Sequence, residues 1–264
     1  LFVTVNAGPG PRLSNGSWDP DQARQLVSHV ADCRQRVPVR ELGNEVNGFS
    51  FIHGPSTRVS ARRYAADFAT FTRMIRAEAP RARTAGPASA YWPLLGEVLP
   101  FMRRFLRHTT TPPDVMSWHY YPQQSSRGVL ATRRAGAYRV LRPHRLNAAA
   151  RGARRLRRAA RRAAARHGHR LPGPEVWLGE TGHALYGGEP GVSDRFVAGL
   201  WWMDHLGLMA RNGSKVVARQ SLVGGDYGLL HPHTMEPRPD FWSSLLWKRL
   251  VGCEVYAVEA AGST

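Results

Sequence analysis

Two glutamates lie at the ends of segments that have the pattern of buried strands. Glu45 follows the stretch RELGN, and Glu180 ends the stretch EVWLGE. Barrel enzymes place their active sites at the rim where the carboxyl ends of parallel strands meet, so we expect both carboxylates there. Two carboxyl groups that flank a sugar, one protonated and one ionised, can cleave a glycosidic bond. The same pattern also fits charges on surface loops, so the residues alone suggest a glycosidase without deciding it.

Other polar residues reach the same rim. Asn44 precedes Glu45 and can donate a hydrogen bond to a sugar 2-hydroxyl, a contact that tightens in the transition state. His119 and Tyr121 end the aromatic strand DVMSWHYYP and can hold the second carboxylate ionised, which separates the pKa values of the two acids. Glu41 falls earlier within its strand, where we expect a structural role. The remaining strand ends are Asn6, Gly86 and Gln220.

Apolar runs and turn residues place strands and helices in alternation. We expect strands at 1–6, 37–45, 83–87, 114–122, 175–180 and 215–225. We expect helices at 19–36, 60–79, 94–108, 192–211 and 240–251, and a further one in a basic segment at 139–170. Such alternation predicts an α/β protein with a parallel sheet. Six βα units fit a (β/α)₈ barrel that lacks two strands, with an open doubly wound sheet as the alternative. No GxGxxG motif supports a dinucleotide fold.

The positive charge is concentrated in one segment. The formal net charge is +18, no acidic residue occurs between Asp114 and Glu175, and residues 139–170 contain 12 arginines, so the rest carries 18 − 12 = +6. Within this segment Ala149, Ala153, Leu156, Ala160 and Ala163 recur at helical spacing, which predicts an amphipathic helix with arginines outward. A solvated helix face explains the pattern simply. A second hypothesis is a catalytically silent protein that binds polyanions through this helix.

Other classes of site and segment find little support. Cys33 and Cys253 are too few and too far apart for a disulfide framework or a cysteine metal site, and HPH at 231–233 lacks further ligands, so we predict no metal and no cofactor. No apolar run is long enough to span a membrane. The opening LFVTVNAGPG lacks the features of a signal peptide and begins within a strand, so we expect a fragment or a processed chain.

Several motifs, taken together and in order, resemble the heparanase and heparanase-like β-glucuronidase family of retaining glycoside hydrolases. They are RELGNEVNGF, VMSWHYYP, VWLGETGHALYGG, GVSDRFVAGLWWMDHLG and VVARQSLVGGDYGLL. The resemblance implies a (β/α)₈ barrel beside a small β-sandwich and cleavage of a bond to β-glucuronic acid. On this basis residues 1–251 are a partial barrel with strands three to eight, 252–264 begin the β-domain, and 139–170 form the basic helix.

The resemblance also implies roles for single residues. Glu45 matches the acid/base and Glu180 the nucleophile. The positions that match substrate contacts are Asn44, His119, Tyr121, Gly187, Gly188, Gln220 and Tyr227. The amides of the glycine pair are expected to help hold the uronate carboxylate, since successive N–H groups form an anion pocket.

The resemblance has limits that bear on the substrate and the location. ASAYWP lacks the Gln and Arg that animal members use for sulfated sugar, and LVGGDYGLL is closer to the plant members. We therefore expect a glucuronic-acid-containing glycan as substrate rather than heparan sulfate in particular. We expect no nucleic acid partner, and a secreted or lysosome- or vacuole-like location.

Overall fold

Six parallel strands form one curled sheet whose order follows the sequence. The computed structural model describes residues 2–92, 96–97, 100–129, 132–166 and 173–256. The strands are β1 (Phe2–Val5), β2 (Val39–Leu42), β3 (Arg83–Trp92), β5 (Val115–Tyr120), β7 (Glu175–Thr181) and β9 (Val216–Arg219), and they pair in that order. A doubly wound sheet reverses its strand order at a switch point. The order here has no such reversal, so the alternative of an open doubly wound sheet is wrong.

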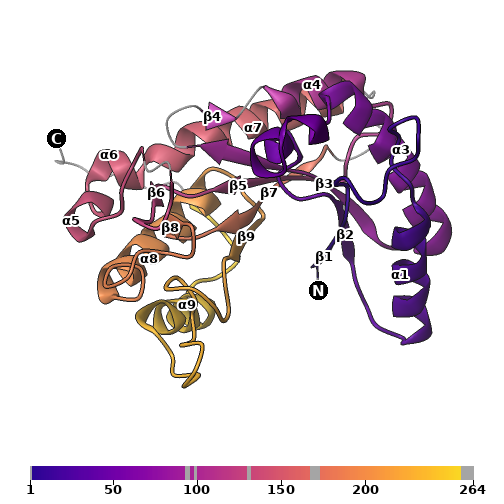
Figure 1. The fold of residues 1–264 in the computed structure, drawn as a ribbon. Coiled ribbons are helices and arrows are strands. Elements are labelled where there is room, and N and C mark those ends of the chain that lie inside the picture. Colours follow the sequence, from indigo (N-terminus) through magenta and orange to yellow (C-terminus); the bar gives the residue numbers. More distant parts are fainter. Residues whose placement is uncertain (1, 93–95, 98–99, 130–131, 167–172, 257–264) are drawn as a thin grey trace.

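Helices follow the outer side of the curl (Figure 1). They are α1 (Asp21–Asp32), α3 (Ala61–Glu78), α4 (Phe101–His108), α7 (Ala148–Arg166), α8 (Phe196–Arg211) and α9 (Pro239–Leu250), with short α2 (Phe49–Ile52), α5 (Ala137–Val140) and α6 (Pro143–Leu146). The expected apolar stripe of α3, formed by Tyr64, Phe68, Phe71 and Ile75, is completely buried against the sheet side. This half-barrel confirms the α/β class and the parallel sheet. None of the described helices is long and apolar enough to cross a bilayer.

Smaller strands and shifted ends mark where the sequence prediction was inaccurate. β4 (Gly96–Glu97) pairs antiparallel with β3, so the helix expected from residue 94 begins only at Phe101. β6 (Gln123–Gln124) and β8 (Ala184–Leu185) pair with each other beside the main sheet. β9 ends at Arg219 rather than continuing to residue 225. The expected start of a β-domain at 252–264 falls mostly at 257–264, outside the described residues.

The basic segment contains three helices instead of one. The expected helix at 139–170 is divided into α5, α6 and α7, because Pro143 cannot continue a helix and begins a new one at its first turn. The predicted amphipathic face is present in α7, where Ala149, Ala153, Leu156, Ala160 and Ala163 are all buried. The expected continuation to residue 170 lies partly outside the described residues.

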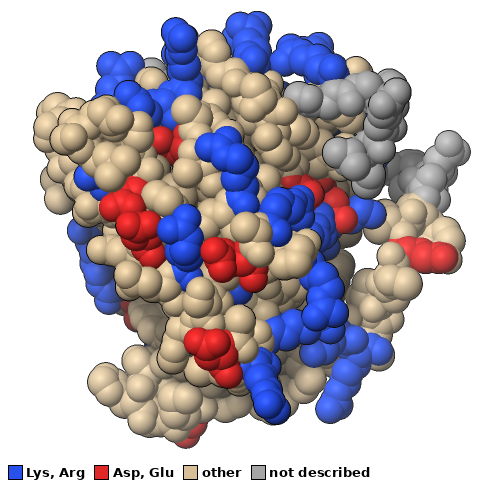
Figure 2. All heavy atoms as spheres, turned by 90° about the vertical axis from the view of Figure 1, so that its right-hand side faces the viewer, with Lys and Arg blue, Asp and Glu red and all other residues tan. Residues whose placement is uncertain are grey.

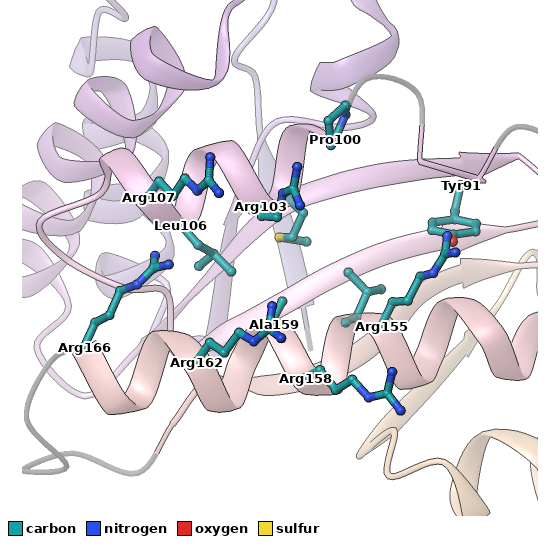
Figure 3. A pocket seen from close by; sticks show the side chains of 12 residues that line it. Tyr91, Pro100, Arg103, Leu106, Arg107, Arg155, Arg158, Ala159, Arg162 and Arg166 are labelled. Carbon is teal, nitrogen blue, oxygen red and sulfur yellow. The ribbon is translucent and has the colours of Figure 1, made fainter.

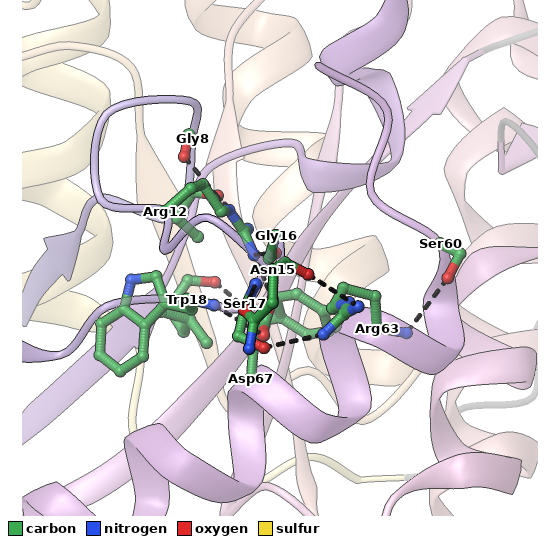
Figure 4. A network of polar contacts seen from close by, with 12 residues as sticks. Gly8, Arg12, Asn15, Gly16, Ser17, Trp18, Ser60, Arg63 and Asp67 are labelled. Atoms are coloured by element: carbon green, nitrogen blue, oxygen red, sulfur yellow. Dashed lines mark hydrogen bonds and ion pairs between the residues drawn. The ribbon is translucent and has the colours of Figure 1, made fainter. Parts of the chain in front are cut away.

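A polar network fixes the loop that follows β1 (Figure 4). Asp67 of α3 accepts hydrogen bonds from the backbone N–H of Trp18 and from the guanidinium of Arg12. Arg63 donates to Ser17 Oγ, and its own backbone N–H donates to the Ser60 side chain that caps α3. Because Asp67 is buried, its charge requires these donors. The network therefore holds the loop, and with it the carboxyl end of β1, against α3.

The inner face of the sheet changes character along the strands. Val39, Ala85 and Val115 form a small apolar cluster with Phe2 and Trp177 near the amino ends. Two residues further along β2 and β5, the inward positions are Glu41 and Ser117, and Ser117 donates to Glu41 in a short hydrogen bond. Residues two apart on a strand point to the same face of the sheet. The inner face therefore changes from apolar to polar toward the carboxyl ends of these strands.

Candidate active site

Tight backbone geometry places Glu45 immediately after β2. Gly43 has φ +78°, and a Cβ at this position would lie 2.6 Å from Val46 and 2.8 Å from Ala7, so only glycine fits. Glu45 itself adopts the left-handed conformation with φ 51°, which is uncommon for a residue with a side chain. Its N–H donates to the carbonyl of Ala88 at 2.9 Å. The turn thus ties the Glu45 backbone to β3.

A shift in strand register places Glu180 beside His119. β5 and β7 pair regularly up to Trp118 and Leu178, and the next pair is His119 with Glu180, so Gly179 is passed over. An extra residue of this kind re-aims the side chains that follow it. Glu180 lies opposite His119 at the carboxyl end of the sheet as a result.

Glu45, His119 and Glu180 form a compact group, although β3 and β5 separate β2 from β7 in the sheet. His119 Nδ1 lies 3.1 Å from Glu45 Oε1 and 3.7 Å from Glu180 Oε2. One ligand atom from each of the three residues lies within 4.8 Å of the others. The curl of the sheet therefore brings one oxygen of each carboxylate to within 4.8 Å of the other.

The two carboxylates have different hydrogen-bond donors. Tyr121 Oη donates to Glu180 Oε1 at 2.6 Å, whereas His119 lies nearer to Glu45. Sequence reasoning assigned both donors to the second carboxylate, and the structure gives Glu180 mainly Tyr121. Burial, and after it the charge of Glu180, raises the pKa of Tyr121, so the phenol keeps the proton that it donates.

Three carboxylates act on the charge of His119. Burial by itself lowers the pKa of His119, but the hydrogen bond to Glu45 and the charges of Glu180, Glu45 and Glu41 together raise it above 6.5. Burial also raises the pKa of Glu41, against the effect of hydrogen bonds from Ser117 and Thr4. Glu41 thus lies beneath the group as a buried residue, held by two hydroxyls.

Gln220 and Tyr227 extend the group behind Tyr121. The Tyr227 ring lies 6.3 Å from the Tyr121 ring. The Gln220 N–H donates to the carbonyl of Thr181 at 2.9 Å, which fixes Gln220 beside the end of β7. Asn44, by contrast, has an exposed side chain on the loop before Glu45.

The glycine pair lies in a tight turn after β8. Gly187 and Gly188 have φ of +84° and +88°. The Gly188 N–H donates to the carbonyl of Ala184 at 3.1 Å, and the Gly187 carbonyl accepts from Asp226. Arg127 donates to the Gly188 carbonyl at 3.1 Å and pairs with Asp226. The Gly188 amide is therefore engaged within the protein, and only Gly187 of the expected amide pair is without such an acceptor among the described residues.

Comparison with known proteins places the chain in a family. Residues 9–207 match the family described as "Glycosyl hydrolase family 79, N-terminal domain". The chain belongs to this family.

Relatives of this family 79 chain are longer than the chain itself. It is 32% identical to the heparanase of Bos taurus over 256 residues, which are 95% of this chain and 43% of the relative. It is 44% identical to the baicalin-β-D-glucuronidase of Scutellaria baicalensis over 88 residues, 33% of this chain and 17% of the relative. A solved 4-O-α-L-rhamnosyl-β-D-glucuronidase from Fusarium oxysporum shares the fold, with TM-score 0.61 and 19% identity over 92% of this chain and 49% of the other.

One wall of the candidate active site was not predicted from the sequence. Glu45, His119 and Tyr121 line a pocket of about 150 Å³ together with Phe51, Ile52, Gln124, Leu185 and Tyr186. Phe51 lies six residues after Glu45, and its side chain is 72% exposed. The FSFI run at 49–52, separated by three residues from the LGNE turn, was the available signal. The apolar wall lies on the Glu45 side of the pocket.

Glu45, His119 and Glu180 also have the chemistry of metal ligands. Two carboxylates and one imidazole, each with an atom within 4.8 Å of the others, match the donor types of many divalent-cation sites. They also match a glycosidase pair bridged by a histidine. A chelation experiment distinguishes the two interpretations, as described in the Discussion.

Proposed function

We propose that this protein is a retaining glycoside hydrolase that cleaves β-glucuronide linkages in a polysaccharide or glycoconjugate. The observation that carries the proposal is the approach of Glu45 and Glu180 at the carboxyl ends of β2 and β7. The unequal donors around the two carboxylates support opposite protonation states, which the reaction requires.

In the first step, Glu180 Oε attacks the anomeric carbon as the bond to the leaving oxygen breaks. Glu45 gives its proton to that oxygen, and a covalent glycosyl-enzyme forms. In the second step, water attacks the anomeric carbon, Glu45 takes a proton from that water, and the bond to Glu180 breaks. The anomeric configuration is retained because the carbon is inverted twice.

The surrounding residues support this division of roles. Tyr121 donates to Glu180 and favours its ionised, nucleophilic form. His119 Nδ1 lies 3.1 Å from Glu45 Oε1 and is proposed to orient this carboxyl group toward the leaving oxygen. The exposed Asn44 is proposed to contact the sugar 2-hydroxyl, and Gln220 and Tyr227 to contact the sugar near Glu180.

The substrate class and the remainder of the protein are part of the proposal. The names of the bovine and Scutellaria relatives, a heparanase and a glucuronidase, favour a glucuronide. Gly187, beside Arg127, is the proposed contact of the uronate carboxylate. We further propose that the half-barrel corresponds to strands three to eight, that a β-domain follows, and that the protein acts in a secreted or vacuole-like setting.

The test is release of an aryl β-glucuronide by wild type, Glu180→Gln and Glu45→Gln. Both variants should lose at least about 10³-fold in kcat/KM, with Glu45→Gln less affected when the leaving group needs no proton. Glu175→Gln is the matched control, because Glu175 begins the same strand at its other end, where it pairs with Arg83 and accepts a hydrogen bond from Trp177 Nε1. NMR of the first product should show the β configuration. An inverted product, or an active Glu180→Gln, would overturn the mechanism.

A further inference from the structure

A groove on the outer side of the half-barrel is lined by arginines from two helices. It has a volume of about 490 Å³ and lies between α4 and α7. Its arginines are Arg103 and Arg107 of α4 and Arg155, Arg158, Arg162 and Arg166 of α7 (Figure 3). On α7 these residues span 11 positions, a length of about 16 Å at 1.5 Å per residue. A single small anion covers only a fraction of that length.

The six arginines have no acidic partner. None of them takes part in an ion pair or a hydrogen bond to a side chain among the described residues. Figure 2 shows that acidic side chains lie between the basic ones over the face that carries α1 and α3, whereas the charged side chains visible along the upper edge, where α4 and α7 lie in Figure 1, are those of Lys and Arg. Unpaired arginines held this close together repel one another, so the groove is suited to an anionic ligand.

The helix that carries four of these arginines is firmly seated. Ala153, Leu156 and Ala160 of α7 are buried in the main core, and a Cβ on Gly152 would lie 3.1 Å from the Trp118 ring. The backbone positions of the arginines are thus fixed by packing, although their side chains are free to adjust. The groove is a built feature of the fold, and its lining includes Met102, Leu106 and Leu156 as an apolar floor.

We propose that this groove binds an anionic polysaccharide that carries sulfate or carboxylate groups on successive sugars. Guanidinium groups bind such oxyanions in a bidentate manner. The aliphatic floor suits the apolar faces of sugar rings, whereas single-stranded nucleic acid usually requires several aromatic stacking surfaces. Tyr91 is the one aromatic residue among the described residues that line the groove.

Tyr91 connects this groove to the candidate active site. It lies at the carboxyl end of β3 and lines both the arginine groove and the pocket that contains Glu45. A bound chain is therefore directed toward the catalytic carboxylates. This last step rests on the proposed function, while the binding itself does not.

Binding is tested first, with the intact chain carrying Glu180→Gln so that the probe is not cleaved. Heparin and hyaluronan are the probes, and calorimetry is run at several salt concentrations. Arg155→Ala/Arg162→Ala should weaken heparin binding by about 10-fold or more and make its salt dependence shallower. Arg154→Ala/Arg161→Ala is the matched control, since both residues are exposed on α7 and neither lines the groove. That pair should change the affinity by less than about threefold.

Three results would overturn the proposal. Equal losses in the two double variants would mean that net charge alone attracts the polymer. Unchanged binding in both would exclude the groove. The groove would be assigned to nucleic acid if an oligonucleotide of matched charge bound more tightly than heparin and its binding were lost in the same groove variant. The connection to catalysis is tested separately in the chain that keeps the wild-type Glu180. In that chain Arg155→Ala/Arg162→Ala should raise KM for a polymer without changing kcat/KM for an aryl glucuronide.

Discussion

The hydrogen bond from Tyr121 to Glu180 gives the sharpest test of the proposed mechanism. Tyr121→Phe removes one oxygen and keeps the ring that packs beside Tyr227. The carboxylate that is proposed to attack the anomeric carbon then loses its shortest hydrogen-bond donor and is held less firmly in position. We therefore expect kcat/KM for an aryl β-glucuronide to fall.

The size of the effect follows from the geometry. A separation of 2.6 Å between the two oxygens is in the range of charge-assisted bonds, which contribute about 1.5–3 kcal/mol. The Glu180 side chain is 25% exposed, so solvent recovers part of this energy, and about 1–2 kcal/mol remains. We therefore expect kcat/KM to fall by about 10-fold.

Tyr120→Phe provides the matched control. Tyr120 is the preceding residue, its buried hydroxyl has no hydrogen-bond partner among the described residues, and its ring stacks on His205 away from the carboxylates. This variant should leave kcat/KM unchanged. The assay is hydrolysis of an aryl β-glucuronide, with thermal unfolding as a check of the fold. If Tyr121→Phe kept the wild-type kcat/KM, the idea that the Tyr121 hydroxyl supports Glu180 as the nucleophile would be refuted.

Three further predictions concern the charge of the site and of the core. Because neighbouring carboxylates raise the pKa of His119, its charged form stabilises the fold below pH 6.5, and this contribution is lost as the pH rises through the raised value. The difference in Tm between wild type and His119→Gln should shrink over that interval, and a constant difference would contradict it. Dialysis against EDTA should leave kcat/KM unchanged within about twofold, and a loss restored by a divalent cation would instead assign a metal to Glu45, His119 and Glu180. Arg219→Met leaves the buried Asp240 unpaired and should lower the free energy of unfolding, measured in urea, by about 3–5 kcal/mol. Arg211→Met, at an exposed position, should lower it by less than about 0.5 kcal/mol. Equal losses in the two variants would mean that the Arg219–Asp240 pair contributes nothing.

The sequence alone was sufficient for many of the local features of this protein. Apolar runs bounded by turn residues located all six parallel strands, because a strand between two packed layers is apolar on both faces. Spacing of three and four residues identified the buried faces of α3 and α7. The same reading put Glu45 and Glu180 at strand ends, since a strand end is a local property.

Only the tertiary structure decided which of these features meet. The register shift between β5 and β7 turns Glu180 toward His119, and it depends on hydrogen bonds between residues about 60 positions apart. The Gly188 N–H donates to the carbonyl of Ala184, a contact that exists only in the folded turn. The arginines of α7 become a groove because α4 packs beside them, and no periodicity within either helix specifies its neighbour. The curl of the sheet, a property of all six strands at once, brings two carboxylates that are 135 positions apart to within 4.8 Å.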